Sequence, residues 1–257
     1  MKLHNIPFSP PDMSDAEILE VAEALRSGWI TTGPKTKEFE RLISLWCGTQ
    51  TSVCLNSATA CMEMILRVLG VGPGDEVITC AYTYTATASV TCHVGAKVVM
   101  VDTAPGTFEM DYDKLADAIT EKTKVIIPVD LAGVVCDYKK VFAAVDSKKH
   151  LFKPSNEIQK AFGRVIVMAD AAHAFGAKQN GKMCGEIADF TSFSFHAVNI
   201  RITSLNIMRT ISASKSSTCI QGFFYAVFLT EYQYLLFSLE LMGEYQGITH
   251  SLTLCEA

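Results

Sequence analysis

A single acid stands where a buried strand is expected to end. The apolar run Arg164–Ala169 is typical of a strand, Asp170 follows it directly, and His173 comes three residues later. Open α/β sheets bind ligands at the carboxyl ends of their strands, so this carboxylate could pair with a cationic ring nitrogen of a ligand. The alternatives are that Asp170 caps a helix and that His173 is a structural histidine.

The segment 56–60, Asn-Ser-Ala-Thr-Ala, offers a different chemistry. It lies between an expected strand, Thr51–Leu55, and an apolar helical pattern that runs through Met62 to Leu69. It therefore places free backbone N–H groups, small side chains and two hydroxyls at a helix N-terminus, which can hold a phosphate. An ordinary helix cap is the alternative interpretation.

Two further segments combine aromatic and hydroxyl side chains. The segment Thr79–Thr87 follows an expected strand and carries Tyr82 and Tyr84, which could stack on a flat heterocycle. The segment Asp189–His196 alternates aromatic and hydroxyl residues, so one face would pack and the other could bind. Plain core packing remains the alternative for both.

The elements that must position these residues alternate along the chain. Helical patterns lie between short apolar runs that indicate buried strands, which predicts an α/β fold with a mostly parallel central sheet flanked by helices. Ser14 and Glu17 form a capping box at the start of the first helix. The expected strands are Thr51–Leu55, Glu76–Thr79, Ala96–Val101, Lys124–Val129 and Arg164–Ala169, with a helix at Asp111–Thr120.

Composition argues against several classes of protein. The net charge is −5 and the basic residues are scattered, which argues against a nucleic-acid partner. The nine cysteines form no CxxC pair, so we expect no metal site and a reduced, cytoplasmic location. The apolar stretch 222–230 is shorter than the ~20 residues of a spanning helix, so we expect no membrane partner.

Six motifs in this order resemble the DegT/DnrJ/EryC1/StrS aminotransferases, a branch of the fold type I pyridoxal-phosphate (PLP) enzymes. The resemblance extends from about Phe8 to Val198, and it implies the large domain of such an enzyme. The motifs are Ser27-Gly-Trp-Ile-Thr-Thr-Gly-Pro34, Asn56-Ser-Ala-Thr-Ala60, Gly74-Asp-Glu-Val-Ile78, Thr83-Tyr-Thr-Ala-Thr87, Asp170-Ala-Ala-His-Ala174 and Ser192-Phe-Ser-Phe-His-Ala-Val198.

The resemblance implies which residues hold the PLP phosphate. Ala58, Thr59 and Ala60 would cradle it, helped by the hydroxyl of Ser194. It also implies transfer of an amino group from glutamate to a nucleotide-linked keto sugar, and a homodimer with active sites at the subunit boundary.

The resemblance also implies residues for the ring and the substrate. Tyr84 would stack on the pyridine ring, Asp170 would bind its nitrogen, and His173 would lie near its ring oxygen. Gly33 and its neighbours would help to shape the sugar-nucleotide site.

One position departs from the family pattern. The lysine that forms the Schiff base with PLP is expected directly after Val198, and Asn199 stands there. An asparagine amide is neither a usable nucleophile nor a general base, so we expect transaminase activity to be impaired.

The departure continues beyond that position. Residues 1–198 are expected to form the PLP-binding large domain with an N-terminal helical segment, and 199–257 an aberrant tail that does not resemble the family's small C-terminal domain. A truncated frameshift product is one hypothesis. A non-catalytic protein that binds PLP or a sugar nucleotide is the alternative.

Overall fold

The computed structural model describes residues 14–29, 32–195 and 225–229. Its centre is a seven-stranded sheet in the order β1-β9-β8-β5-β4-β2-β3. Six strands run in one direction and β9 runs against them. The strands are β1 (Thr51–Leu55), β2 (Glu76–Cys80), β3 (Lys97–Val101), β4 (Thr123–Ile127), β5 (Ile166–Asp170), β8 (Phe190–Ser194) and β9 (Tyr225–Leu229), and a separate hairpin joins β6 (Lys178–Gln179) to β7 (Lys182–Met183). The predicted fold class, a mostly parallel sheet flanked by helices, is confirmed.

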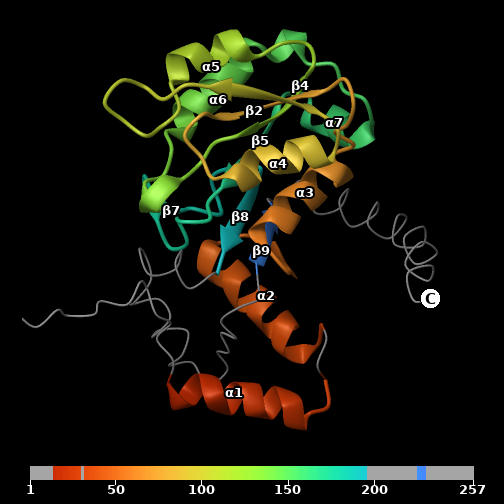
Figure 1. The fold of residues 1–257 in the computed structure, drawn as a ribbon, viewed down its shortest axis with the longest axis vertical. Coiled ribbons are helices and arrows are strands. Elements are labelled where there is room, and N and C mark those ends of the chain that lie inside the picture. The colour runs from red at the N-terminus through yellow and green to blue at the C-terminus, as the bar shows by residue number, and fades with distance from the viewer. Residues whose placement is uncertain (1–13, 30–31, 196–224, 230–257) are drawn as a thin grey trace, which may run out of the picture.

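Helices cover both faces of this sheet, as Figure 1 shows for α5 and α6 on one side and the adjacent α3 and α4 on the other. Helix α2 contributes Ile43 and Cys47 to the same core as α5 and α6, and α7 contributes Ile158 to the core of α3 and α4. The helices are α1 (Asp15–Arg26), α2 (Pro34–Cys47), α3 (Ala58–Val68), α4 (Thr85–His93), α5 (Tyr112–Ala118), α6 (Tyr138–Ser147) and α7 (Glu157–Phe162), with short 3₁₀ turns η1 (Leu131–Gly133) and η2 (Lys149–Leu151).

Alternate residues of the central strands enter two different cores. In β2, Val77 packs toward α3 and α4, whereas Ile78 packs toward α5 and α6. Because both faces are covered, every residue of β2, β4, β5 and β8 is buried. This double burial is why these strands are continuous apolar runs in the sequence.

Side-chain caps fix where the helices begin. The predicted capping box at α1 is present, with Ser14 and Glu17 as its two members. Ser57 caps α3 by accepting from Ala60 N at 2.9 Å, and Asp111 caps α5 at the start of the predicted 111–120 helix. Each cap satisfies a backbone donor that the helix itself cannot satisfy.

Strand β9 lies within the apolar stretch 222–230, which from the sequence was considered only as a membrane span. Tyr225–Leu229 pairs with β8 on one side and β1 on the other, both antiparallel. Of the helices that the structure describes, none has the length and apolar character that a membrane crossing requires.

Candidate functional site

The parallel strands bring chemically distinct residues to one edge of the sheet. Helix α3 begins just after β1, and α4 begins just after β2. Asp170 ends β5 and Ser194 ends β8. Because all four strands run in the same direction, these groups gather at the carboxyl edge, where open α/β sheets bind ligands.

The carboxylate of Asp170 is buried at this edge. The residue is 5% exposed, and Thr87 Oγ1 donates to its Oδ2 at 2.6 Å. Ala172 N–H donates to Oδ1 at 3.3 Å. Among the described residues, no lysine or arginine forms an ion pair with this carboxylate, so its negative charge lacks a full positive counterpart there.

The surroundings of Asp170 shift its protonation equilibrium. Burial raises the pKa of its carboxyl, while the Thr87 hydrogen bond, the Ala172 N–H and the nearby His173 act in the opposite direction. The net shift is upward, because loss of hydration outweighs these three contributions. A cationic ligand beside Oδ1 or Oδ2 would favour the ionised form.

Two threonines of the 83–87 motif form a chain that ends on this carboxylate. Thr83 Oγ1 lies 2.7 Å from Thr87 Oγ1. Each hydroxyl has one proton, and that of Thr87 is used toward Asp170, so Thr83 must be the donor between the two threonines. The motif thus orients the Asp170 carboxylate from α4. This helix follows β2, which lies two strands away from β5 in the sheet.

The N-terminus of α3 supplies the second part of the site. The first intrahelical hydrogen bond runs from Cys61 N to Ser57 O at 2.9 Å, so the N–H groups of Ala58 and Thr59 precede it. Ser192 Oγ, buried in β8, donates to Ala58 O at 3.1 Å. This bond anchors the start of α3 to β8, the strand that also carries Ser194.

The structure brings Tyr84 and Asp170 into the same region. Tyr84 is the residue that precedes the first turn of α4, three residues before Thr87, and its side chain is 79% exposed. His173 follows Asp170 after β5, and its Nδ1 accepts from Ala132 N–H at 3.4 Å. Tyr84 and Asp170, which are both expected to contact the ring, therefore lie at one edge of the sheet and not on opposite sides of the molecule.

One predicted site residue, Gly33, is not part of this cluster. Gly33 precedes α2, and the side chain nearest to it is that of Trp29. Asn199 lies outside the described residues.

Three residues with contacts in this region were not singled out from the sequence. Thr87 and Ser192 lay inside quoted motifs, but nothing local distinguished them from their neighbouring hydroxyl residues. Asp130 follows β4 as Asp170 follows the buried run of β5, and this repeated pattern of a strand followed by an acid could have identified it. Its N–H donates to Asp170 O at 2.9 Å.

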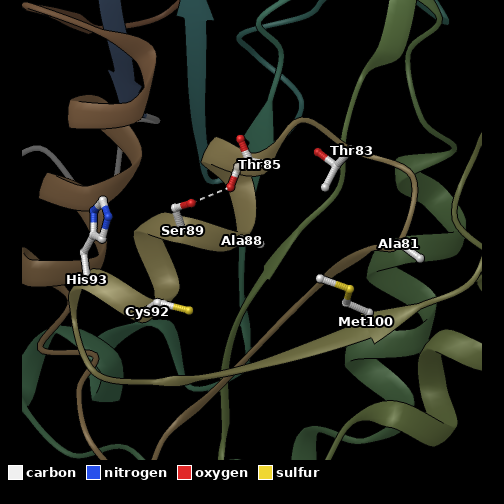
Figure 2. A pocket seen from close by; sticks show the side chains of 8 residues that line it. All are labelled: Ala81, Thr83, Thr85, Ala88, Ser89, Cys92, His93 and Met100. Carbon is white, nitrogen blue, oxygen red and sulfur yellow. Dashed lines mark hydrogen bonds between the residues drawn. The ribbon is translucent and has the colours of Figure 1, made fainter.

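A surface hollow of about 340 Å³ lies beside α4 and β3 (Figure 2). Ser89 Oγ in its wall donates to Thr85 O at 2.8 Å, and the ring of His93 lies 2.7 Å from Glu63 Oε2. The hollow contains no carboxylate that could pair with a cationic ring and includes neither Asp170 nor Ser194. It is therefore distinct from the site at the carboxyl edge. Its lining residues are Ala81, Thr83, Thr85, Ala88, Ser89, Cys92, His93 and Met100.

Solved structures of known proteins share this architecture. The putative sugar aminotransferase Spr1654 of Streptococcus pneumoniae superposes with a TM-score of 0.79 and 55% identity over 89% of this chain and 53% of that protein. It has been solved in apo, pyridoxamine-phosphate (PMP) and PLP forms. The 3-amino-5-hydroxybenzoic acid synthase superposes with a TM-score of 0.70 and 29% identity, over 89% of this chain and 52% of that protein.

Sequence comparison agrees with the structural one. The spore coat polysaccharide biosynthesis protein SpsC of Bacillus subtilis is 37% identical over 194 residues, which are 76% of this chain and 46% of SpsC. The chain thus spans about half the length of the relatives that it matches. A model of the DegT/DnrJ/EryC1/StrS aminotransferase family, whose cofactor is PLP, matches residues 11–204. The chain therefore belongs to the DegT/DnrJ/EryC1/StrS aminotransferase family.

Proposed function

We propose that residues 1–198, whose sheet β9 completes between β1 and β8, are the cofactor-binding large domain of a PLP-dependent sugar aminotransferase. The observation that carries this proposal is the buried carboxylate of Asp170, which has no lysine or arginine partner among the described residues and whose pKa is raised by burial. A protonated pyridine nitrogen would supply the missing positive charge. The remaining polar groups at this edge fit the other parts of the same cofactor.

The phosphate of PLP would be held at the start of α3. Ala58, Thr59 and Ala60 form the first turn, where the helix dipole favours an anion. The N–H groups of Ala58 and Thr59 would donate to the phosphate, whereas that of Ala60 donates to Ser57 Oγ. The hydroxyl of Ser194 would add a donor from the end of β8. Ser57 and Ser192 would position this turn, because Ser57 caps it and Ser192 bonds to Ala58 O.

The ring would be held between the elements that follow β2 and β5. Asp170 would pair with the ring nitrogen, Tyr84 would stack on the ring, and His173 would lie near its ring oxygen. Thr87 would hold the Asp170 carboxylate in place through its 2.6 Å hydrogen bond. When bound, PLP supplies a ring that accepts electrons from the carbon whose amino group is transferred.

The substrates and assembly follow from the family. We propose glutamate as the amino donor and a nucleotide-linked keto sugar as the acceptor, with Gly33 and its neighbours helping to shape the sugar site. We also propose a cytoplasmic homodimer. These assignments concern the whole protein of the family, of which this chain spans about half the length.

Asn199 favours a second candidate function for this chain. An amide at the lysine position can neither attach the cofactor covalently nor transfer a proton, so transamination would fall by several powers of ten. The non-covalent contacts of Asp170 and of the α3 N-terminus do not depend on residue 199. The second candidate is therefore a protein that binds PLP or a sugar nucleotide without catalysis.

Equilibrium dialysis of the full chain against PLP tests the cofactor site. We expect saturable binding that borohydride does not fix to the protein, and Asp170→Ala should weaken it. Absence of binding by the folded chain would contradict the proposal. An amino-transfer assay with glutamate and a panel of nucleotide-linked keto sugars then separates the two candidates, because only an aminotransferase forms amino sugar.

A further inference from the structure

Two aspartates lie at the carboxyl ends of neighbouring strands, but their carboxylates face opposite sides of the sheet. Asp130 comes after β4, and its N–H donates to Asp170 O at 2.9 Å. The Asp170 carboxylate meets Thr87 of α4, whereas that of Asp130 is fully buried beside Tyr138 of α6. The backbone of Asp130 therefore contacts the site through Asp170 O, whereas its carboxylate lies on the other side of the sheet, away from the site.

The Asp130 carboxylate accepts three hydrogen bonds from the protein. Its Oδ1 accepts from Cys136 N–H at 2.8 Å. Its Oδ2 accepts from Tyr138 Oη at 3.0 Å and from Cys184 Sγ at 3.1 Å. These bonds connect the end of β4 to the far end of the loop 131–137, so the carboxylate closes that loop upon itself.

Other residues reinforce the same end of the loop. Gln179 Nε2 donates to Val135 O at 3.2 Å and to Cys136 O at 2.7 Å. Asp137 N–H donates to Tyr112 Oη at 2.7 Å. With residues 135–137 fixed on several sides, the first half of the loop has little freedom to relax.

That first half adopts a backbone conformation that alanine rarely takes. Ala132 has φ 53° and Gly133 has φ 82°. A non-glycine residue in the left-handed region persists only where its surroundings impose it. Here the imposed conformation directs Ala132 N–H toward His173 Nδ1, at 3.4 Å.

The direction of this hydrogen bond selects a tautomer. A backbone N–H can only donate, so Nδ1 must accept, and a neutral ring then carries its proton on Nε2. We propose that Asp130 is a positioning residue that, by closing the loop 131–137, holds His173 in the tautomer protonated on Nε2. This inference rests on the proposed function, because in that function His173 lies near the ring oxygen of PLP, to which an Nε2–H group could donate.

Nitrogen NMR of the ring tests the proposal without cofactor or turnover. The full chain is labelled with ¹⁵N-histidine, and His173→Gln identifies the His173 signals among the six histidines. At mildly alkaline pH we expect Nε2 of His173 to carry the proton and Nδ1 to show the shift of an acceptor. A proton on Nδ1 in the wild-type chain would overturn the proposal.

Two variants separate positioning from general stabilisation. Asp130→Asn replaces one accepting oxygen with an NH₂ group, so the side chain can no longer accept both from Cys136 N–H and from Tyr138 Oη and Cys184 Sγ. The loop should therefore loosen, and the His173 signals should shift toward a mixture of tautomers. Tyr138→Phe is the matched control, because it removes one donor from Oδ2 but leaves the Oδ1 bond to Cys136 N–H. We expect the wild-type tautomer in Tyr138→Phe. An unchanged tautomer in a folded Asp130→Asn chain would refute the positioning role.

A further variant loosens the same loop and serves if Asp130→Asn does not fold. Gln179→Met removes the two bonds to Val135 O and Cys136 O from outside the core, and it should also shift the His173 signals toward a mixture. PLP binding is measured separately on the same samples. A chain with the expected tautomer that binds no PLP would refute the proposed function alone, whereas PLP binding with the wrong tautomer would refute this inference alone.

Discussion

Thr87 Oγ1 donates to Asp170 Oδ2 at 2.6 Å, across 83 residues of sequence. Both residues are buried, and the bond joins α4 to the end of β5. It makes the protonation of Asp170 depend on a hydroxyl from a different element, and several tests follow from that dependence and from the groups around it.

Thr87→Val should weaken PLP binding. The substitution removes the donor to the ionised carboxylate and raises the pKa of Asp170 further, which disfavours the ion pair with the ring nitrogen. A hydrogen bond to a charged group typically contributes ~1.5–3 kcal/mol, so we expect a loss of about tenfold or more in affinity by equilibrium dialysis. Thr85→Val, at an exposed position of the same helix, is the control and should bind PLP as the wild type does.

Thr59→Glu should change stability and phosphate binding in opposite directions. A carboxylate in the first turn of α3 interacts favourably with the helix dipole, by ~0.3–1 kcal/mol, so Tm without ligand should rise slightly. The same charge repels the phosphate of PLP, and affinity should fall by at least about tenfold. Thr59→Gln keeps the size without the charge and should bind more tightly than Thr59→Glu. Equal affinities would argue against a phosphate at this turn.

Asn199→Lys should allow covalent attachment of PLP. A lysine amine is a nucleophile toward the cofactor aldehyde, whereas the asparagine amide is not. After borohydride reduction, mass spectrometry should find the cofactor on Lys at position 199 in the variant and on no residue of the wild type. Asn199→Gln serves as the control of similar polarity. Attachment to the wild-type chain would contradict the expected impairment.

Asp130 should make folding stability depend on pH. Burial raises the pKa of Asp130 from its ordinary value of 3.8 to about 6. The folded state therefore binds more protons than the unfolded state between these values, and the contribution of Asp130 to stability falls as pH rises through this window. The full change is ~3 kcal/mol. The free energy of unfolding in urea, measured at a series of pH values, should lack this pH dependence in Asp130→Asn. The same pH dependence in both proteins would contradict the prediction.

Gly33→Ala should disturb Trp29 without affecting PLP binding. A methyl group at Gly33 would come within 2.0 Å of Trp29 Cδ1, so the exposed indole must move and its 2.8 Å bond from Nε1 to Thr32 O should break. Tryptophan fluorescence should report the movement. PLP affinity should stay unchanged, because Gly33 lies outside the Asp170 cluster.

The sequence predicted the main elements to within a few residues. The run expected as a strand at Glu76–Thr79 forms Glu76–Cys80, and the one expected at Lys124–Val129 forms Thr123–Ile127. These strands were recognisable because burial on both faces leaves an uninterrupted apolar run. Strand β9 has the same kind of run, Tyr225–Leu229, but from the sequence it was considered only as a membrane span, for which it is too short.

Contacts between distant elements were not predictable in the same way. The sequence placed Asp170 at a strand end, but only the structure paired it with Thr87. It gave no sign that Asp130, after the neighbouring strand, would turn its carboxylate toward α6 instead of α4. In a pleated strand, the side that a residue faces depends on its place in the register, which the whole sheet sets.

The sequence by itself therefore determined the alternation of strands and helices, the family, and the presence of asparagine at position 199. These depend on patterns between residues close in the chain, such as a cap three residues from its partner or an apolar run of five. The tertiary structure alone decided the order of the strands and the closure of the 131–137 loop by Asp130. It also decided that α4 supplies the hydroxyl for Asp170, because such contacts form only when the entire sheet has packed against its helices.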